Sequence, residues 1–302
     1  MAASEAAEPA FVPESGFLGR GHERNERKTW TVIALCATMT VLEITAGRLF
    51  GSMALVADGL HMSTHAAALV IAAVAYAYAR NHADDPSFAF GTGKLGDLAG
   101  FSSAIVLAIV AVLTGYEAIT RLFQPGAIDF DIAIPTAVAS LAVNVASAWL
   151  LSGSDDGPGA TNRDNNMRAA LFHVIADVAV SVLAILGLLA GKFLGLAFMD
   201  PLMGLLGMLV IANWSYALVR ATGAVLLDRT PDREMAAKIR AEIELDGDRL
   251  NDLRLWRLGP GHLGAIVSVT TNKPRNPDYY RARLARFDLL SHLAIEIRSV
   301  AP

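Results

Sequence analysis

Six apolar stretches, each close to the roughly 20 residues that a helix needs to cross a bilayer, fill most of the chain before residue 228. Charge follows the same division: residues 29–227 hold 21 of the 54 charged residues, and residues 228–302 hold 24. Such a chain is not a single soluble domain. We therefore expect a mobile tail at 1–28, a membrane part at 29–227 and a small separate domain at 228–302. The predicted spans are 30–50, 52–79, 98–122, 131–151, 166–190 and 199–226.

The positive charges near the span ends predict the orientation. An even number of spans places both termini on one side, and Lys and Arg gather on the cytoplasmic side of membrane proteins. One set of span ends carries eleven of these residues and the other carries three. We therefore expect both termini in the cytoplasm. The larger set is Arg20, Arg24, Arg27, Lys28, Arg80, Lys94, Arg163, Arg168, Arg220, Arg229 and Arg233; the smaller is Arg48, Arg121 and Lys192.

The pattern after residue 228 is typical of a small α/β domain. Its order, helix–strand–strand–helix–strand, would form a sheet with two helices on one face. The domain has 13 Lys and Arg against 11 Asp and Glu, so it offers no basic surface and we expect no nucleic-acid partner. The expected elements are a helix with Thr230 as N-cap and Pro231 in its first turn, strands on either side of the turn 259–261, a helix at 277–290 and a strand at 291–299.

Two pairs of candidate metal ligands lie inside predicted spans. His61 and His65 are four residues apart in the second span, and His173 and Asp177 are four apart in the fifth. Such groups are costly inside a membrane, so they are functional candidates by default. Residues four apart share one helical face and can bind one ion. Together the pairs provide four nitrogen and oxygen ligands, a tetrahedral set.

The depths of the two pairs agree. At 1.5 Å per residue, His61 and His65 lie roughly 16 and 10 Å from the cytoplasmic face of a core about 30 Å thick. His173 and Asp177 lie roughly 10 and 16 Å from the same face. The pairs therefore fall at matching levels on antiparallel helices, and we expect them to bind one ion jointly. A packing role for the histidines is the alternative.

Other polar residues in the spans are weaker candidates. Three roles are open for Asp58: a fifth metal ligand, a hydrogen-bond partner of the ligands, or a hydrogen bond that packs two helices. Glu43 and Asn144 suit hydrogen bonds between helices, with a place in a pathway or proton relay as the alternative. The segment 90–97 lacks the preceding strand and the Gly-Lys-Ser/Thr ending of a phosphate loop, so we expect no nucleotide site. The single cysteine, Cys36, excludes an intramolecular disulfide.

Three residues of the small domain are candidates for a regulatory metal site. His262 begins a predicted strand, and His292 and Glu296 lie an even number of residues apart on another, hence on one face. Solvated or structural roles are the alternative for all three.

The second span carries the motif of a known family. The segment 51–61 (GSMALVADGLH) is similar to the second-span signature of the cation diffusion facilitators, and His173 and Asp177 fall on their fifth-span site. The resemblance runs from about Trp30 to Ile297. It implies six transmembrane helices followed by a cytoplasmic ferredoxin-like domain, tails paired in a homodimer and, for a bacterial member, the inner membrane.

The branch within that family is suggested by two features. The segment 88–101 (FAFGTGKLGDLAGF) and the two-histidine second span look most like the DmeF-type branch, which is associated with cobalt and nickel efflux. Zinc-type members usually carry Asp at the position of His65. DmeF-type members often have a His-rich loop between spans four and five, whereas residues 151–164 contain no His.

We therefore expect efflux of Co²⁺ or Ni²⁺, with Zn²⁺ and Cd²⁺ as further substrates. Ligation needs neutral imidazole and ionised carboxylate, so exchange for protons is the expected driving reaction. The metal ion is cargo, and we expect no prosthetic group and no enzymatic activity. Seven histidines are too few for a membrane di-iron hydroxylase, and no HExxH motif of a zinc protease is present. The alternatives are a zinc-type exporter and a membrane-bound metal sensor without transport.

Overall fold

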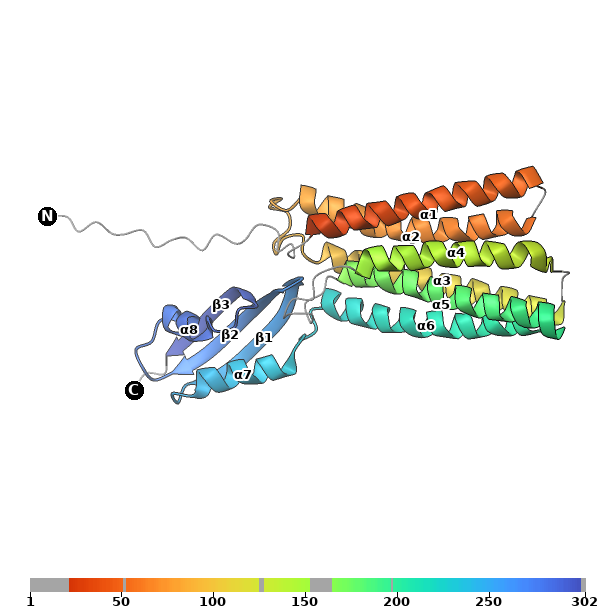
Figure 1. Cartoon of the computed structure of the whole chain (residues 1–302). Helices are drawn as coiled ribbons and strands as arrows, with labels where there is room; N and C mark the ends of the chain where they lie inside the picture. The colour runs from red at the N-terminus through yellow and green to blue at the C-terminus, as the bar shows by residue number, and fades with distance from the viewer. Residues whose placement is uncertain (1–21, 51–52, 125–127, 153–164, 197, 300–302) are drawn as a thin grey trace.

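Six long helices lie side by side, and a small α/β domain lies beyond one end of them (Figure 1). The computed structural model describes residues 22–50, 53–124, 128–152, 165–196 and 198–299. Within the helices some side chains are not described, among them those of 53–61, 64–65 and 165–169. The helices are α1 (His22–Phe50), α2 (Met53–Asn81), α3 (Leu95–Phe123), α4 (Phe130–Ser152), α5 (Asn165–Leu194) and α6 (Met199–Leu226).

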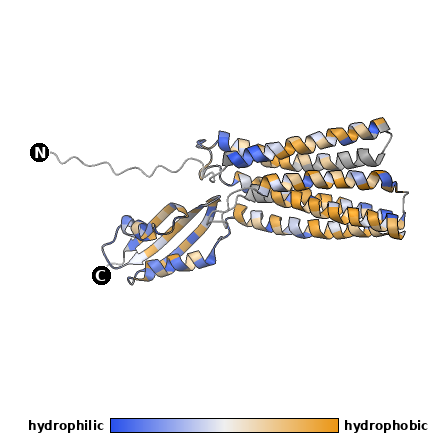
Figure 2. Cartoon of the chain, viewed as in Figure 1, coloured by the Kyte–Doolittle hydropathy of each residue, from blue (hydrophilic) through white to orange (hydrophobic). Residues whose placement is uncertain are grey.

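Five of these helices are long and apolar enough to cross a membrane, namely α1, α3, α4, α5 and α6. Figure 2 shows the hydrophobic residues that dominate α3 to α6. Large apolar side chains such as Leu113, Trp149 and Phe193 are exposed on the helices, as expected of a surface that faces lipid. Helix α2 has 29 residues, but the search covers only described residues, so its crossing remains a prediction.

The helices pack as neighbours, α1 on α2, α3 on α6, and α5 on both α4 and α6. Small residues allow the close approach, as is usual for helices in membranes. At Gly187 of α5, an added methyl group would lie 2.8 Å from the Cα of Asp200 in α6. We call the end of the bundle beside the small domain the tail side and the opposite end the far side. Helices α1, α3 and α5 run from the tail side to the far side (Figure 1).

Helix α1 begins at His22, earlier than the predicted end of the mobile tail at residue 28. Glu26 is buried and pairs with Arg80 of α2 at 2.5 Å, which holds this extra stretch against its neighbour. The Thr29 hydroxyl donates to the Asn25 carbonyl one turn back. The prediction for residues 1–21 lies outside the described residues.

The tail domain, which the structure describes from residue 228 to 299, has the predicted order of elements. These are α7 (Arg233–Glu244), β1 (Arg249–Gly259), β2 (His262–Thr271), α8 (Pro277–Leu284) and β3 (Leu290–Ser299). Strand β2 is central, antiparallel to β1 and parallel to β3. Gly261, in the turn between β1 and β2, has φ +82°, where glycine is favoured. The described part of this domain thus has the order αββαβ, which lacks the first strand of the βαββαβ order of ferredoxin-like domains.

One core lies between the sheet and the two helices. Apolar side chains at four-residue spacing on α7 meet alternate residues of β2, since one face of each element is apolar. Helix α8 closes this core with Tyr280 and Leu284. The buried members are Met235, Ile239, Ile243, Leu250, Leu255, Leu263, Ala265, Val267, Val269, Tyr280 and Leu284.

Two predicted helix ends were wrong. Asp232, rather than Thr230, is the N-cap of α7, because its carboxylate accepts hydrogen bonds from the backbone nitrogens of Glu234 and Met235 at 2.8 and 3.0 Å. Helix α8 ends at Leu284 instead of residue 290. The residues that follow turn toward β3, whose first residue is Leu290.

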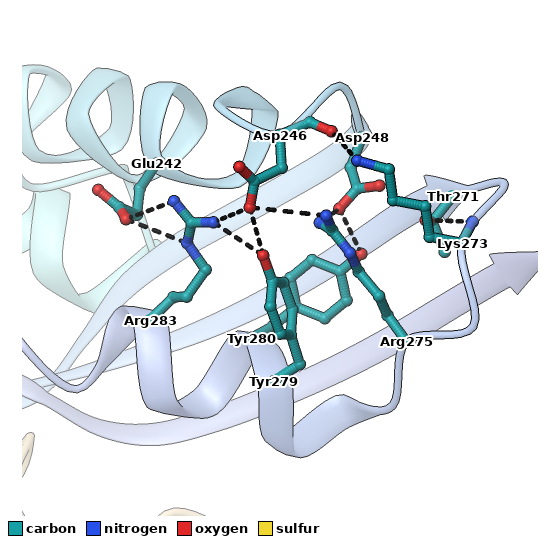
Figure 3. A network of polar contacts seen from close by, with 9 residues as sticks. All are labelled: Glu242, Asp246, Asp248, Thr271, Lys273, Arg275, Tyr279, Tyr280 and Arg283. Atoms are coloured by element: carbon teal, nitrogen blue, oxygen red, sulfur yellow. Dashed lines mark hydrogen bonds and ion pairs between the residues drawn. The ribbon is translucent and has the colours of Figure 1, made fainter.

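A polar network ties α8 to the turn between α7 and β1 (Figure 3). The Asp248 side chain is fully buried and forms an ion pair with Arg275. The same carboxylate oxygen accepts a hydrogen bond from the Tyr280 hydroxyl at 2.8 Å. A buried charge is costly unless it is paired, so these contacts offset the cost of placing Asp248 in the domain.

Asp246 forms the exposed half of this network. It accepts a hydrogen bond from the Tyr279 hydroxyl and pairs with Arg283, which also holds Glu242 at 2.9 Å (Figure 3). The Tyr279 hydrogen bond, with the charges of Arg283 and Arg275, lowers the pKa of Asp246. Because the pKa is lowered in the folded protein, these contacts are complete above the carboxylate's ordinary pKa and are lost as pH falls through the lowered value.

Candidate intramembrane metal site

The fifth helix places two candidate ligands within one turn. His173 Nε2 lies 3.8 Å from Asp177 Oδ2, and both side chains are buried. The four-residue spacing brings imidazole and carboxylate to the same side of α5, as the sequence predicts. This separation leaves the two groups close enough to ligate a common ion.

Helix α2 reaches the same region. Met62 of α2 and Asp177 of α5 line one cavity of about 130 Å³. Met62 is the residue that follows His61, so the backbone of the two-histidine segment passes this level of the bundle. The side chains of Asp58, His61 and His65 lie outside the described residues. The four-ligand site therefore remains a prediction.

The surroundings of the α5 pair differ between its two sides. Toward the tail side, Ala170 belongs to an apolar cluster drawn from α1, α2, α4 and α5. Toward the far side, Asp177 borders the cavity, where polar groups gather. The members of the tail-side cluster are Val32, Ile33, Cys36, Leu69, Ala73, Leu151, Ala170 and Val174.

Polar residues that were not predicted as site residues also line the cavity. Asn144 of α4 donates a hydrogen bond from its amide nitrogen to the Ser181 hydroxyl of α5 at 3.4 Å, which confirms the predicted contact between helices. Ser140 lies one turn from Asn144, and Ser181 one turn from Asp177. That four-residue spacing is the signal that would have found them. Glu43, the other predicted packing residue, is buried in α1.

The three tail candidates have separate surroundings. His262 hydrogen-bonds Ser291 at 2.7 Å, and Glu296 pairs with Arg298 at 3.2 Å. Over the residues whose side chains are described, no three His, Cys, Asp or Glu side chains form a metal-binding group. A regulatory metal at His262, His292 and Glu296 stays a prediction.

His292 lies at the junction between the bundle and the tail domain. Phe90, from the connection between α2 and α3, makes edge contacts with Trp256 and His292, at ring-centroid distances of 5.7 and 5.6 Å. Lys94 pairs with Asp228 beside the same junction. The segment around Phe90 thus docks the sheet against the helices, a role that its sequence did not reveal.

Residues 29–227 match the family described as the cation efflux transmembrane domain. The chain belongs to the cation efflux family. It is 31% identical to the zinc transporter ZitB of Escherichia coli over 98% of this chain and 90% of that protein. It is 30% identical to the metal cation efflux system protein CzcD of Cupriavidus metallidurans over 86% and 83%. It is 27% identical to the cadmium, cobalt and zinc/H(+)-K(+) antiporter of Bacillus subtilis over 80% and 78%.

Membership of the cation efflux family confirms the resemblance to the cation diffusion facilitators. The polar pair in α5 lies inside the family's transmembrane domain, at residues 173 and 177 of a match that spans 29–227. The cargo of a cation efflux protein is the ion itself, so a transport site has to bind the metal ion and also release it.

Proposed function

We propose that this protein exports divalent transition-metal ions from the cytoplasm through a four-ligand site in the membrane. The observation that carries the proposal is the buried pair His173 and Asp177 of α5, 3.8 Å apart, beside the cavity that Met62 of α2 also lines. His61 and His65 complete the site from α2. Three imidazoles and one carboxylate suit Co²⁺, Ni²⁺ and Zn²⁺, whereas Mg²⁺ and Ca²⁺ prefer oxygen ligands.

Cobalt and nickel are the proposed principal cargo, and zinc is the second candidate. The second imidazole, at His65, favours borderline ions that accept nitrogen ligands. The names of the relatives support a transition metal, since ZitB is a zinc transporter and the Bacillus subtilis relative carries cadmium, cobalt and zinc.

Protons are the proposed counter-ions. A metal-bound site requires deprotonated ligands, so protons leave as the ion binds and return as it is released. Histidine is suited to this exchange because its ordinary pKa is close to physiological pH. The Bacillus subtilis relative is named as an antiporter that exchanges protons and potassium for metal, which supports the same class of reaction.

We further propose that all six helices cross the membrane, with the tail side in the cytoplasm and the tail domain a ferredoxin-like unit without its first strand. Eleven Lys and Arg near the tail-side ends against three near the far-side ends support this orientation. The bacterial relatives support an inner-membrane location.

The decisive experiment measures metal flux into vesicles that hold the purified protein with the tail domain outward. Co²⁺, Ni²⁺, Zn²⁺, Cd²⁺ and Mn²⁺ are compared with and without an acidic interior. We expect Co²⁺ or Ni²⁺ to enter fastest, with the rate raised by the proton gradient. Metal binding without flux of any ion would identify a sensor and overturn the proposal. Faster Zn²⁺ than Co²⁺ would identify a zinc-type exporter.

We also propose that the protein acts as a homodimer held partly by the tails. A domain of about 75 residues buries a modest core, so a second copy would add stabilising contact. In mild detergent the mass from light scattering should equal two chains, and truncation after Asp228 should weaken the dimer and slow transport. A monomeric mass at concentrations that retain transport would contradict the proposal. A dimer that survives truncation would place the main contact between the membrane helices.

A further inference from the structure

Along the described part of α5, the cavity extends from Asp177 toward the far side. On α5, Asp177, Ser181 and Ala184 line it in succession, over about 10 Å of helix at 1.5 Å per residue. Because α5 runs from the tail side to the far side, each of these residues lies further from the tail domain than the one before. The cavity therefore leads from the site toward the far side.

The facing helices line the cavity at the same levels. On α4, which runs in the opposite direction, Asn144 and Ser140 line the cavity in that order toward the far side. Thr114 of α3 lines it as well. Four uncharged polar side chains from three helices, including Ser181, thus surround one space. Asn144 and Ser140 are buried, and polar groups are costly to place inside a membrane bundle, which makes them candidates for a functional role.

The space is large enough to hold water. A cavity of about 130 Å³ is well above the roughly 15 Å³ that one water molecule needs, and waters need polar partners of this kind. On the tail side of Asp177, the described side chains of the cluster that holds Ala170 and Val174 are apolar. Among the described residues, those that line the cavity thus offer amide, hydroxyl and water oxygens to an ion that leaves Asp177 toward the far side.

We propose that this cavity is the release path of the metal ion, and that Asn144 and Ser181 are the first groups to take the ion from Asp177. The inference rests on the proposed export of divalent metals. Neutral oxygens hold a borderline divalent ion more weakly than imidazole and carboxylate do. They can therefore accept the ion from its ligands and still give it up to water, as a conduction path requires. The Asn144 nitrogen is bonded to Ser181, so the amide oxygen is the remaining polar atom to meet the ion.

Cysteine accessibility tests the direction of the path. The chain has one cysteine, Cys36, so a Cys36→Ala background allows single cysteines to be placed at will. Ser181→Cys probes the cavity. Ser215→Cys is the matched control, because Ser215 is a buried hydroxyl that donates to the Ala104 carbonyl and does not line the cavity. A small cationic methanethiosulfonate reagent that does not cross membranes is added to vesicles of either orientation.

We expect Ser181→Cys to react from the far side, Co²⁺ to slow the reaction, and Ser215→Cys to remain unreactive from both sides. Reaction only from the tail side, or reaction equal to that of the Ser215 control, would overturn the release path. Each variant must first bind Co²⁺ as the parent does, which shows that it is folded.

Transport gives a second, independent measurement. Ser181→Ala and Asn144→Leu should lower the rate of Co²⁺ flux by about tenfold with the dissociation constant for Co²⁺ little changed, which corresponds to about 1.4 kcal/mol at the barrier. Ser215→Ala should leave the rate unchanged. Parental flux in both cavity variants would overturn the proposal. Absence of flux in the parent protein would instead refute the proposed function, so the two failures are distinguishable.

Discussion

Replacing Asp177 with Asn is expected to abolish metal transport while the protein remains folded. The substitution keeps the shape of the side chain and removes the only negative charge among the four proposed ligands. Changes outside the ligand shell of metal sites already cost 10–100-fold, so we expect a loss of flux of at least about 100-fold for Co²⁺ and Zn²⁺ alike. His173→Ala should have the same effect, because it leaves three ligands.

Stability separates this effect from misfolding. Asp177 is buried, and an uncharged amide costs less to bury than a carboxylate. The melting temperature of Asp177→Asn should therefore equal or exceed that of the parent. The matched control is Asp131→Asn at the start of α4, where the carboxylate is largely exposed and pairs with Lys192 at 2.7 Å. Exposed pairs contribute little, so this control should transport normally.

Flux of Co²⁺ and calorimetric binding of Co²⁺ in detergent decide the outcome. Parental flux in Asp177→Asn or in His173→Ala would remove α5 from the site. Normal binding with no flux in Asp177→Asn would make this carboxylate a group for ion release, rather than one required for ion capture.

His65→Asp should change which metal is exported. The substitution replaces a nitrogen ligand with a harder oxygen and produces the pattern usual in zinc-type members. We expect the ratio of Co²⁺ to Zn²⁺ transport to fall by about tenfold, the equivalent of about 1.4 kcal/mol between the two ions. The number of ligands is unchanged, so total transport should persist.

The control for this substitution is His82→Asp, the same chemical change outside the proposed membrane spans. His82 follows α2 and its Nδ1 hydrogen-bonds the Tyr78 carbonyl at 3.0 Å. Rates for both ions are measured singly and in competition at equal expression. An unchanged ratio in His65→Asp would place metal discrimination elsewhere in the bundle.

The parts of the fold that follow from local patterns were predictable. Apolar runs located the long helices, and alternation around the turn at Gly261 located β1 and β2. The pair His173 and Asp177 was predictable for the same reason, because residues four apart on one helix share a face whatever the neighbouring helices are. The helix-to-helix contact of Asn144 followed from the cost of a polar group in a membrane.

The parts that depend on tertiary contacts were not predictable. Asp248 and Arg275 are 27 residues apart, and only the packed domain brings them together. The contacts of His292 were out of reach for a related reason: its neighbours Phe90 and Trp256 come from other elements, so its even spacing from Glu296 could not reveal them. The capping error at α7 arose because Thr230 and Asp232 are both good caps, and the deciding geometry is that of the backbone.

Because β3 is the last described element of the chain and pairs with the central strand β2, the tail sheet can form completely only late in synthesis. Helices α1 to α6 leave the ribosome before any part of the tail domain, whereas the sheet closes only when β3 has emerged. Until then one edge of β2 is unpaired and the core lacks Leu293, Ile295 and Ile297. An open apolar edge favours association with other chains. Translation that stops shortly before β3 would therefore leave the helices joined to an incomplete tail domain that is prone to associate with other chains.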